Sequence, residues 1–225
     1  MTLVFLHEGL GSAELWRDFP QRIGNAVGEG IVVESRRGYG HGPPIDLPRR
    51  VTYMHEEAEL LRAMDVSEPV LIGHSDGASI ALIAAGSGMA VRGLVLIAPH
   101  VFVEERSVAG IAAAKEAYDS GDLRARLARW HDDVDGAFRG WNDAWLSAEF
   151  RDWDVTTFLP RIECPVLLIQ AEDDPYGTLA QLEAIAADVS GPVERLVVAG
   201  RSHAPHLDHD EEVLGAIVRW LPQRS

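Results

Sequence analysis

The most informative segment of the chain is residues 70–82, VLIGHSDGASIAL. Its first three residues are apolar, as expected of a short buried strand, and its last five are small and mostly apolar, as in a helix packed closely on a sheet. Between them lies the motif Gly73-His74-Ser75-Asp76-Gly77. A G-x-S-x-G motif is common by chance, but its position between a strand and a helix makes it informative.

This motif indicates a serine on a sharp turn. Such a serine takes a strained backbone conformation, and side chains two positions away would collide with the turn. Gly73 and Gly77 meet that demand. The turn also directs the free N–H groups of the helix toward charge that develops near Ser75. We therefore interpret Ser75 as a nucleophile; the alternative is a structural turn with an incidental serine.

Apolar runs of strand length alternate with helical patterns along the chain. Because the runs lack polar alternation, we expect strands that are buried on both faces of a parallel sheet. The expected strands are residues 2–7, 31–34, 69–74, 93–98, 165–170 and 195–199, and the expected helices are residues 13–27, 52–64, 76–85, 178–187 and 211–221. This order predicts an α/β fold, with a mostly parallel sheet of about six strands and helices on both faces.

Residues 99–160 break the alternation, because they show helical patterns at 108–118, 123–130 and 134–145 but no strand pattern. We expect residues 99–161 to form a helical lid inserted into a core of residues 1–98 and 162–225. Four of the six tryptophans fall in this segment: Trp130, Trp141, Trp145 and Trp153. They either pack the lid on the core or line an apolar substrate pocket, and we assign Trp130, Trp141 and Trp145 to the pocket.

A serine hydroxyl needs a base to remove its proton, and the base needs a carboxylate to orient it. In its elbow motif and in the motifs that follow, the sequence resembles the α/β-hydrolase family over nearly its whole length. In that family the triad follows the chain order serine, acid, histidine. The resemblance implies an α/β-hydrolase fold and a serine hydrolase.

The acid is expected after a late strand. Residues 166–170 end in Ala171-Glu172-Asp173-Asp174, which is similar to the family's G-x-x-D with alanine in place of the glycine. This register implies that Asp174 is the acid. Asp173 stays open as the alternative, and a solvated acidic turn is the structural interpretation of the pair.

The base is expected after the last strand, in residues 200–208, GRSHAPHLD. This stretch resembles the family's turn in which an acidic residue follows the catalytic histidine by five positions. Asp208 then sets the register on His203. His206 is the alternative base, or a histidine that packs or hydrogen-bonds nearby.

The oxyanion hole is expected partly in the loop after the first strand. Residues 7–12, HEGLGS, are similar to the family's H-G-x-G loop, but Glu8 replaces the first glycine. The resemblance implies that the N–H of Asp76 is one donor and that Gly9 or Leu10 supplies the other; a glycine-rich turn without a catalytic N–H is the alternative. Residues 36–40, RRGYG, resemble the family's R-G-x-G loop, to which we assign no catalytic role.

Composition excludes several classes of partner. The net charge of −15 repels nucleic-acid phosphates and anionic lipids, so we expect neither nucleic-acid nor membrane partners. The N-terminus lacks the basic region of a signal peptide, and no apolar run reaches the ~18 residues that span a bilayer, so we expect a cytoplasmic protein. Cys164 is the only cysteine and is interpreted as a small buried side chain rather than a redox or catalytic group.

No metal or cofactor is expected. His203, His206 and His209 are spaced like metal ligands, but serine catalysis already accounts for one of them. Residues 131–136 resemble a calcium loop, yet Asn142 stands where the twelfth-position glutamate is required. Residues 9–11 lack the third glycine of a dinucleotide fingerprint.

The expected function is carboxylesterase-like hydrolysis of a small, largely apolar or aromatic ester through an acyl-enzyme at Ser75. A lactonase, a C–C bond hydrolase with the same triad, and a receptor-like protein with poor turnover stay open. The chain begins at the strand before the oxyanion loop, without the N-terminal hairpin common in the family. We expect either a shortened sheet or a sheet edge covered by a second copy in a homo-oligomer.

Overall fold

The computed structural model describes residues 1–221 and contains one six-stranded sheet. All strand pairs are parallel, in the order β2-β1-β3-β4-β5-β6. The strands are β1 (Thr2–Leu6), β2 (Gly30–Val33), β3 (Val70–His74), β4 (Gly93–Ile97), β5 (Val166–Ala171) and β6 (Val193–Val198). This sheet confirms the predicted α/β class.

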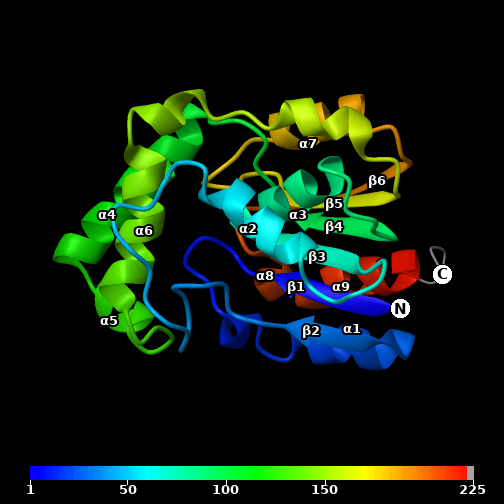
Figure 1. Ribbon diagram of the computed structural model, residues 1–225, viewed down its shortest axis with the longest axis horizontal. Helices are drawn as coiled ribbons and strands as arrows, with labels where there is room; N and C mark the ends of the chain where they lie inside the picture. The colour runs from blue at the N-terminus through cyan, green and yellow to red at the C-terminus, as the bar shows by residue number, and fades with distance from the viewer. Residues whose placement is uncertain (222–225) are drawn as a thin grey trace.

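Helices cover both faces of the sheet (Figure 1). Helices α1 (Phe19–Val27) and α9 (Asp210–Trp220) pack on one face, and α2 (Tyr53–Arg62), α3 (Asp76–Gly86) and α7 (Ala180–Asp188) pack on the other. The central strands alternate between the two cores: Leu71 faces the α2–α3 side, whereas Val70 and Ile72 face the α1–α9 side. Burial on both faces explains the unbroken apolar runs in the sequence.

The two edge strands differ from the expectation of full burial. In β2 the four residues are exposed or half-buried, and in β6 only Val198 is buried. An edge strand has one neighbour instead of two, so its side chains keep more contact with water.

Residues between β4 and β5 form helices at one end of the sheet, where α4, α5 and α6 lie together (Figure 1). They are α4 (Glu105–Ser120), α5 (Leu123–Leu127) and α6 (Val134–Leu146), followed by the short 3₁₀ helices η2 (Glu149–Asp152) and η3 (Thr156–Arg161). The rings of Tyr118 and Phe138 stack 3.7 Å apart between α4 and α6. That this segment acts as a lid on a separate core stays a prediction.

The prediction of a single helix over residues 13–27 is wrong. The structure has a 3₁₀ turn, η1 (Ala13–Trp16), and then α1, which begins at Phe19. Arg17 separates them with a φ of 54°, and Pro20 lies in the first turn of α1. Proline fits the start of a helix but lacks the N–H that a continuous helix would need there. Nothing in the sequence marks this break, because the helical spacing of apolar residues continues across it.

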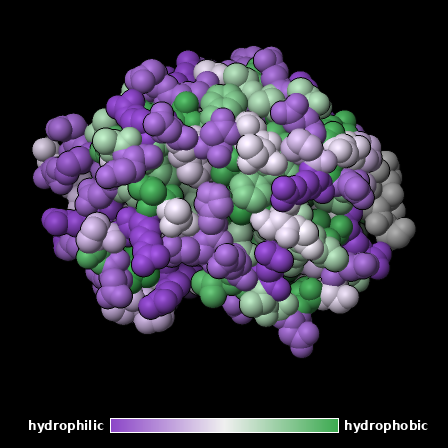
Figure 2. Space-filling view, turned by 45° about the horizontal axis from the view of Figure 1, so that its top comes forward, coloured by the Kyte–Doolittle hydropathy of each residue, from purple (hydrophilic) through white to green (hydrophobic). Residues whose placement is uncertain are grey.

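Hydrophilic side chains dominate the face in Figure 2, above all over the helical segment, and hydrophobic ones occur there in scattered groups. This surface agrees with the excess of acidic residues in the sequence. No helix within residues 1–221 combines the length and the apolar character needed to cross a membrane.

Candidate active site

Ser75 lies at the junction of β3 and α3, in a strained conformation with φ 52° and ψ −117°. The glycines on either side are required by close contacts. A Cβ on Gly73 would lie 2.5 Å from the carbonyl oxygen of Gly77, and a Cβ on Gly77 would lie 2.1 Å from that of Leu6. The sequence-based argument for small residues at these positions therefore holds in the structure.

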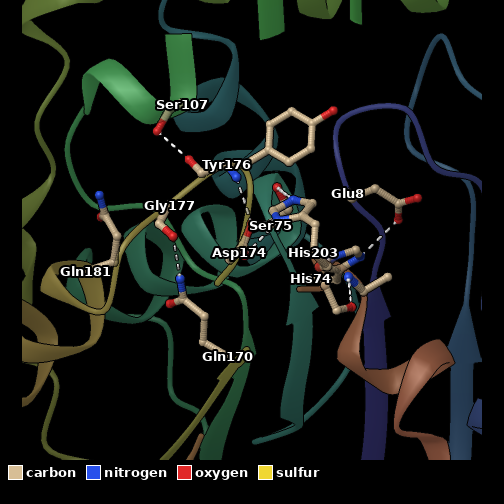
Figure 3. A network of polar contacts seen from close by, with 12 residues as sticks. Glu8, His74, Ser75, Ser107, Gln170, Asp174, Tyr176, Gly177, Gln181 and His203 are labelled. Carbon is tan, nitrogen blue, oxygen red and sulfur yellow. Dashed lines mark hydrogen bonds and ion pairs between the residues drawn. The ribbon is translucent and has the colours of Figure 1, made fainter. Parts of the chain in front are cut away.

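The structure brings Ser75, His203 and Asp174 together (Figure 3). Nε2 of His203 lies 3.0 Å from Oγ of Ser75, and Nδ1 lies 2.9 Å from both carboxylate oxygens of Asp174. Ser75 lies at the elbow after β3, Asp174 in the loop after β5 and His203 in the loop after β6. Because the strands are parallel, these three positions lie at the same edge of the sheet, where the strands end. Because the Asp174 carboxylate accepts a hydrogen bond from Nδ1–H, the proton of the neutral ring stays on Nδ1, and Nε2 is free to accept the serine proton.

Asp174 is buried, with 1% of its surface exposed. Burial alone would raise the pKa of this carboxyl, but the charge and hydrogen bond of His203 and the N–H of Tyr176 lower it below its ordinary value. Asp173, the alternative acid, instead pairs at the surface with Arg106 and Arg201. Asp174 is therefore the ionised carboxylate that contacts His203.

His206 and Asp208 do not touch Ser75 in the described contacts. The ring of His206 is buried and packs 4.8 Å from Trp16. Asp208 accepts a 2.7 Å hydrogen bond from Oγ of Ser202, the residue before His203. The acidic residue that set the register in the sequence thus holds the loop of the histidine rather than the imidazole.

The expected oxyanion donors surround one small cavity with Ser75. Gly9, Leu10 and Asp76 line this cavity of about 120 Å³. Within residues 1–221, no acceptor takes up their N–H groups. A side chain at position 9 would displace the indole of Trp141, because a Cβ on Gly9 would lie 2.1 Å from Nε1 of that ring. The arrangement leaves N–H donors beside the serine, as oxyanion stabilisation requires.

The loop after β1 is anchored by a residue to which sequence reasoning gave no part in the site. The carbonyl oxygen of Glu8 accepts hydrogen bonds from Arg36 and from Nδ1 of His7, both at 2.7 Å. Nε2 of His7 accepts from the N–H of Arg36 at 2.9 Å. Arg36 in turn forms a buried ion pair with Glu57 on α2. The R-G-x-G loop therefore holds the loop after β1 in place.

The cavity is lined by apolar and aromatic side chains, among them Ile111, Trp141, Trp145 and Tyr176. Trp130 is not among the lining residues and is 37% exposed, so the structure does not support its assignment to the pocket. It lies just after α5, where the helical pattern ends earlier than expected and the indole faces outward.

His100 also lines the cavity, and sequence reasoning missed it. It is 3% exposed, and its Nδ1 has no hydrogen-bond partner among the described residues. Burial, with smaller effects of neighbouring charges, lowers the pKa of His100 to about 4, so the ring is neutral near pH 7. It follows β4 in a segment without a recognisable motif, which is why no signal marked it.

No cluster of three or more histidine, cysteine, aspartate and glutamate side chains suited to a metal ion occurs in the described part of the chain. Nδ1 and Nε2 of His203 face Asp174 and Ser75, respectively.

Comparison with known proteins fits this geometry. A sequence model described as the alpha/beta hydrolase family matches residues 3–216. The chain belongs to the α/β-hydrolase family. This α/β hydrolase is 25% identical to non-heme chloroperoxidase CPO-A1 of Kitasatospora aureofaciens, over 89% of the chain and 84% of that protein. It is 26% identical to the serine hydrolase BPHL of Homo sapiens, over 81% of the chain and 66% of that protein.

The fold of this hydrolase also resembles solved structures. The proline iminopeptidase of Mycobacterium smegmatis superposes with a TM-score of 0.74 at 18% identity, covering 100% of this chain and 90% of that one. At this identity the likeness shows the fold alone.

Proposed function

We propose that this α/β hydrolase is a serine hydrolase that cleaves an ester-like bond of a small, largely apolar or aromatic substrate. The observation that carries the proposal is the hydrogen-bonded chain from Ser75 through His203 to Asp174, beside a cavity with unused N–H donors. The name of the human relative, a serine hydrolase, supports the same class.

The reaction begins when Ser75 Oγ attacks the carbonyl carbon and its proton passes to Nε2 of His203. Asp174 stabilises the imidazolium that forms. The tetrahedral oxyanion lies at the N–H groups of Asp76 and of Gly9 or Leu10. As the bond to the leaving group breaks, His203 gives its proton to the leaving oxygen, and an acyl ester remains on Ser75.

Water completes the cycle. His203 takes a proton from a water molecule, whose oxygen attacks the acyl carbon, and a second tetrahedral oxyanion forms in the same place. The bond to Ser75 Oγ breaks, and the serine oxygen regains the proton from Nε2. The product acid leaves, so one water is consumed per bond cleaved.

The cavity supports a small substrate. Its walls include the indole rings of Trp141 and Trp145 and the side chain of Ile111, which favour apolar groups. The net charge of −15 also disfavours an anionic substrate in solution.

Fluorophosphonate labelling tests the proposal. The wild type is expected to be labelled, and Ser75→Ala is expected to lose labelling and to lower ester hydrolysis by several orders of magnitude. Ser67→Ala is the matched control, because Ser67 is exposed and precedes β3, whereas the elbow lies at the other end of that strand. Labelling that persists in Ser75→Ala would remove Ser75 from the mechanism.

A screen of esters with increasing acyl length then separates the alternatives. Short esters are expected to give the highest kcat/KM. Hydrolysis of lactones or C–C bonded diketones with no ester turnover would replace the ester by those substrates. Tight binding with negligible turnover would indicate a receptor-like protein.

A further inference from the structure

His74, the residue before the nucleophile, bridges two loops of the site (Figure 3). Its Nδ1 lies 3.3 Å from Oε2 of Glu8, in the loop after β1, and its Nε2 lies 2.7 Å from the backbone carbonyl oxygen of His203. The side chain of His74 is 3% exposed and that of Glu8 is 28% exposed. The bridge therefore joins the oxyanion loop to the loop that carries the base.

The partners of this ring fix its number of protons. A backbone carbonyl only accepts hydrogen bonds, and an ionised carboxylate also only accepts them. Both ring nitrogens of His74 must then donate, and a histidine with two N–H groups is an imidazolium. The buried cation is balanced by the carboxylate of Glu8.

We propose that Glu8 and a doubly protonated His74 are a positioning pair that holds the backbone of His203 and thereby aims the catalytic imidazole at Ser75. The proposal rests on the serine-hydrolase function above. Glu8 and His74 need not touch the reacting atoms, since they act through the carbonyl oxygen of His203.

The side chain of His203 is already held at Nδ1 by Asp174, and Nε2 faces Ser75. These two bonds orient the ring, but neither of them reaches the backbone of His203, whose carbonyl oxygen contacts Nε2 of His74 instead. The His74 hydrogen bond supplies a backbone anchor. Glu8, which stands where the family's loop usually has glycine, places its carboxylate within reach of His74.

Several charged and titratable groups face the pair. Glu8 contacts His74 and lies near His7; the Arg36 guanidinium donates to the carbonyl oxygen of Glu8, and the charge of Glu8 also acts on His131. The His74 ring lies 5.1 Å from that of His203 and 4.7 Å from that of His206, and the charge of Asp174 also acts on it. Burial alone would lower the pKa of His74, but Glu8, the His203 carbonyl and Asp174 raise it. Burial also lowers the pKa of His206, which keeps that neighbour neutral.

The first test compares Glu8→Leu with Glu8→Gln on the best ester found in the screen. Leucine removes every partner of Nδ1, and we expect kcat to fall roughly 10- to 100-fold with a smaller change in KM. The glutamine amide can donate a hydrogen bond to Nδ1 of a neutral His74 ring, whose Nε2–H still donates to the carbonyl oxygen of His203. Glu8→Gln is therefore expected to keep most of the kcat that Glu8→Leu loses. Glu116→Leu, an exposed change on α4, is the control.

The second test is the pH profile of kcat. In the wild type, activity is expected to fall at alkaline pH as the His74 ring loses one proton and with it one of its two bonds. In Glu8→Gln this alkaline decrease is expected to disappear, because the ring is neutral throughout. If Glu8 had a purely structural role, its substitution would change the melting temperature but not the alkaline decrease in kcat.

The third test does not depend on activity. Nitrogen NMR of labelled protein is expected to show both ring nitrogens of His74 protonated at neutral pH in the wild type, and one protonated nitrogen in Glu8→Gln. A singly protonated His74 in the wild type would overturn the proposal, as would a Glu8→Leu variant with wild-type kcat. An active Ser75→Ala would instead overturn the proposed function and leave the NMR result standing.

Discussion

Nε2 of His131 donates a hydrogen bond to the carbonyl oxygen of Leu10 at 3.0 Å, which connects the helical segment to the loop after β1. Nδ1 of the same ring accepts a 2.9 Å hydrogen bond from the N–H of Gly40. One donating and one accepting nitrogen require a neutral ring. Burial, the largest effect, lowers the pKa of His131 and favours that form.

Replacing His131 by alanine is expected to weaken this junction. The carbonyl of Leu10 and the N–H of Gly40 would lose their partner, and we expect the free energy of unfolding to fall by about 1–3 kcal/mol. Denaturant titration measures this change, and kcat/KM for the best ester is expected to fall with it. An alanine variant as stable and as active as the wild type would contradict the role of the link.

Asp174→Asn keeps the shape of the acid but favours the wrong tautomer of His203. We expect kcat to fall by about 10³- to 10⁴-fold, as in other serine triads. Asp173→Asn is the matched control, since that carboxylate pairs with arginines at the surface and is expected to change kcat little. Equal losses in both variants would leave the acid unassigned.

Gly9→Ala places a methyl group where the indole of Trp141 lies. We expect the loop to shift, with a loss of about 1–3 kcal/mol in stability and a large loss of activity. Adding Trp141→Leu to Gly9→Ala is expected to restore part of the activity, because the smaller side chain makes room for the methyl. Activity of the double variant no higher than the single variant would contradict this clash.

His100→Leu separates stability from activity. Nδ1 of His100 has no hydrogen-bond partner among the described residues, so a buried polar atom is removed without loss of a protein hydrogen bond at that position. We expect the melting temperature to stay the same or rise, whereas KM for the best ester increases because a polar wall of the cavity is lost. Calorimetry and steady-state kinetics check the two effects, and a lower melting temperature would contradict the first.

The pair of Glu8 and His74 predicts how stability depends on pH. The folded pKa of His74 is raised above 6.5, so its contribution is fully present below pH 6.5 and is lost as pH rises through the raised value. The pKa of Glu8 is lowered from 4.5, since its contacts with His74 outweigh the opposing effect of burial, so its contribution is present above pH 4.5 and is lost as pH falls through the lowered value.

Melting temperatures of the wild type and Glu8→Gln across pH measure this effect. The wild type is expected to exceed the variant most between pH 4.5 and 6.5, with the difference shrinking in alkaline solution. A difference that does not change with pH would show that the pair is not ionised.

Local sequence patterns determined the strands, most helices and the position of Ser75. Buried parallel strands have runs of apolar residues, and the elbow requires glycines at a fixed spacing. Both features can therefore be recognised from a few consecutive residues. The break of the first helix at Arg17 was missed, because the apolar periodicity continues across it.

Sequence patterns and the family resemblance were enough to predict the fold, Ser75 and the two loops expected to carry the acid and the base. The folded structure was needed to show that Asp174 rather than Asp173 contacts His203, that Trp130 does not line the cavity, and which contacts Arg36, His100 and His131 make. The physical reason is distance along the chain: each of these depends on side chains dozens of residues apart that become neighbours when the sheet forms. Short-range patterns carry no record of such contacts.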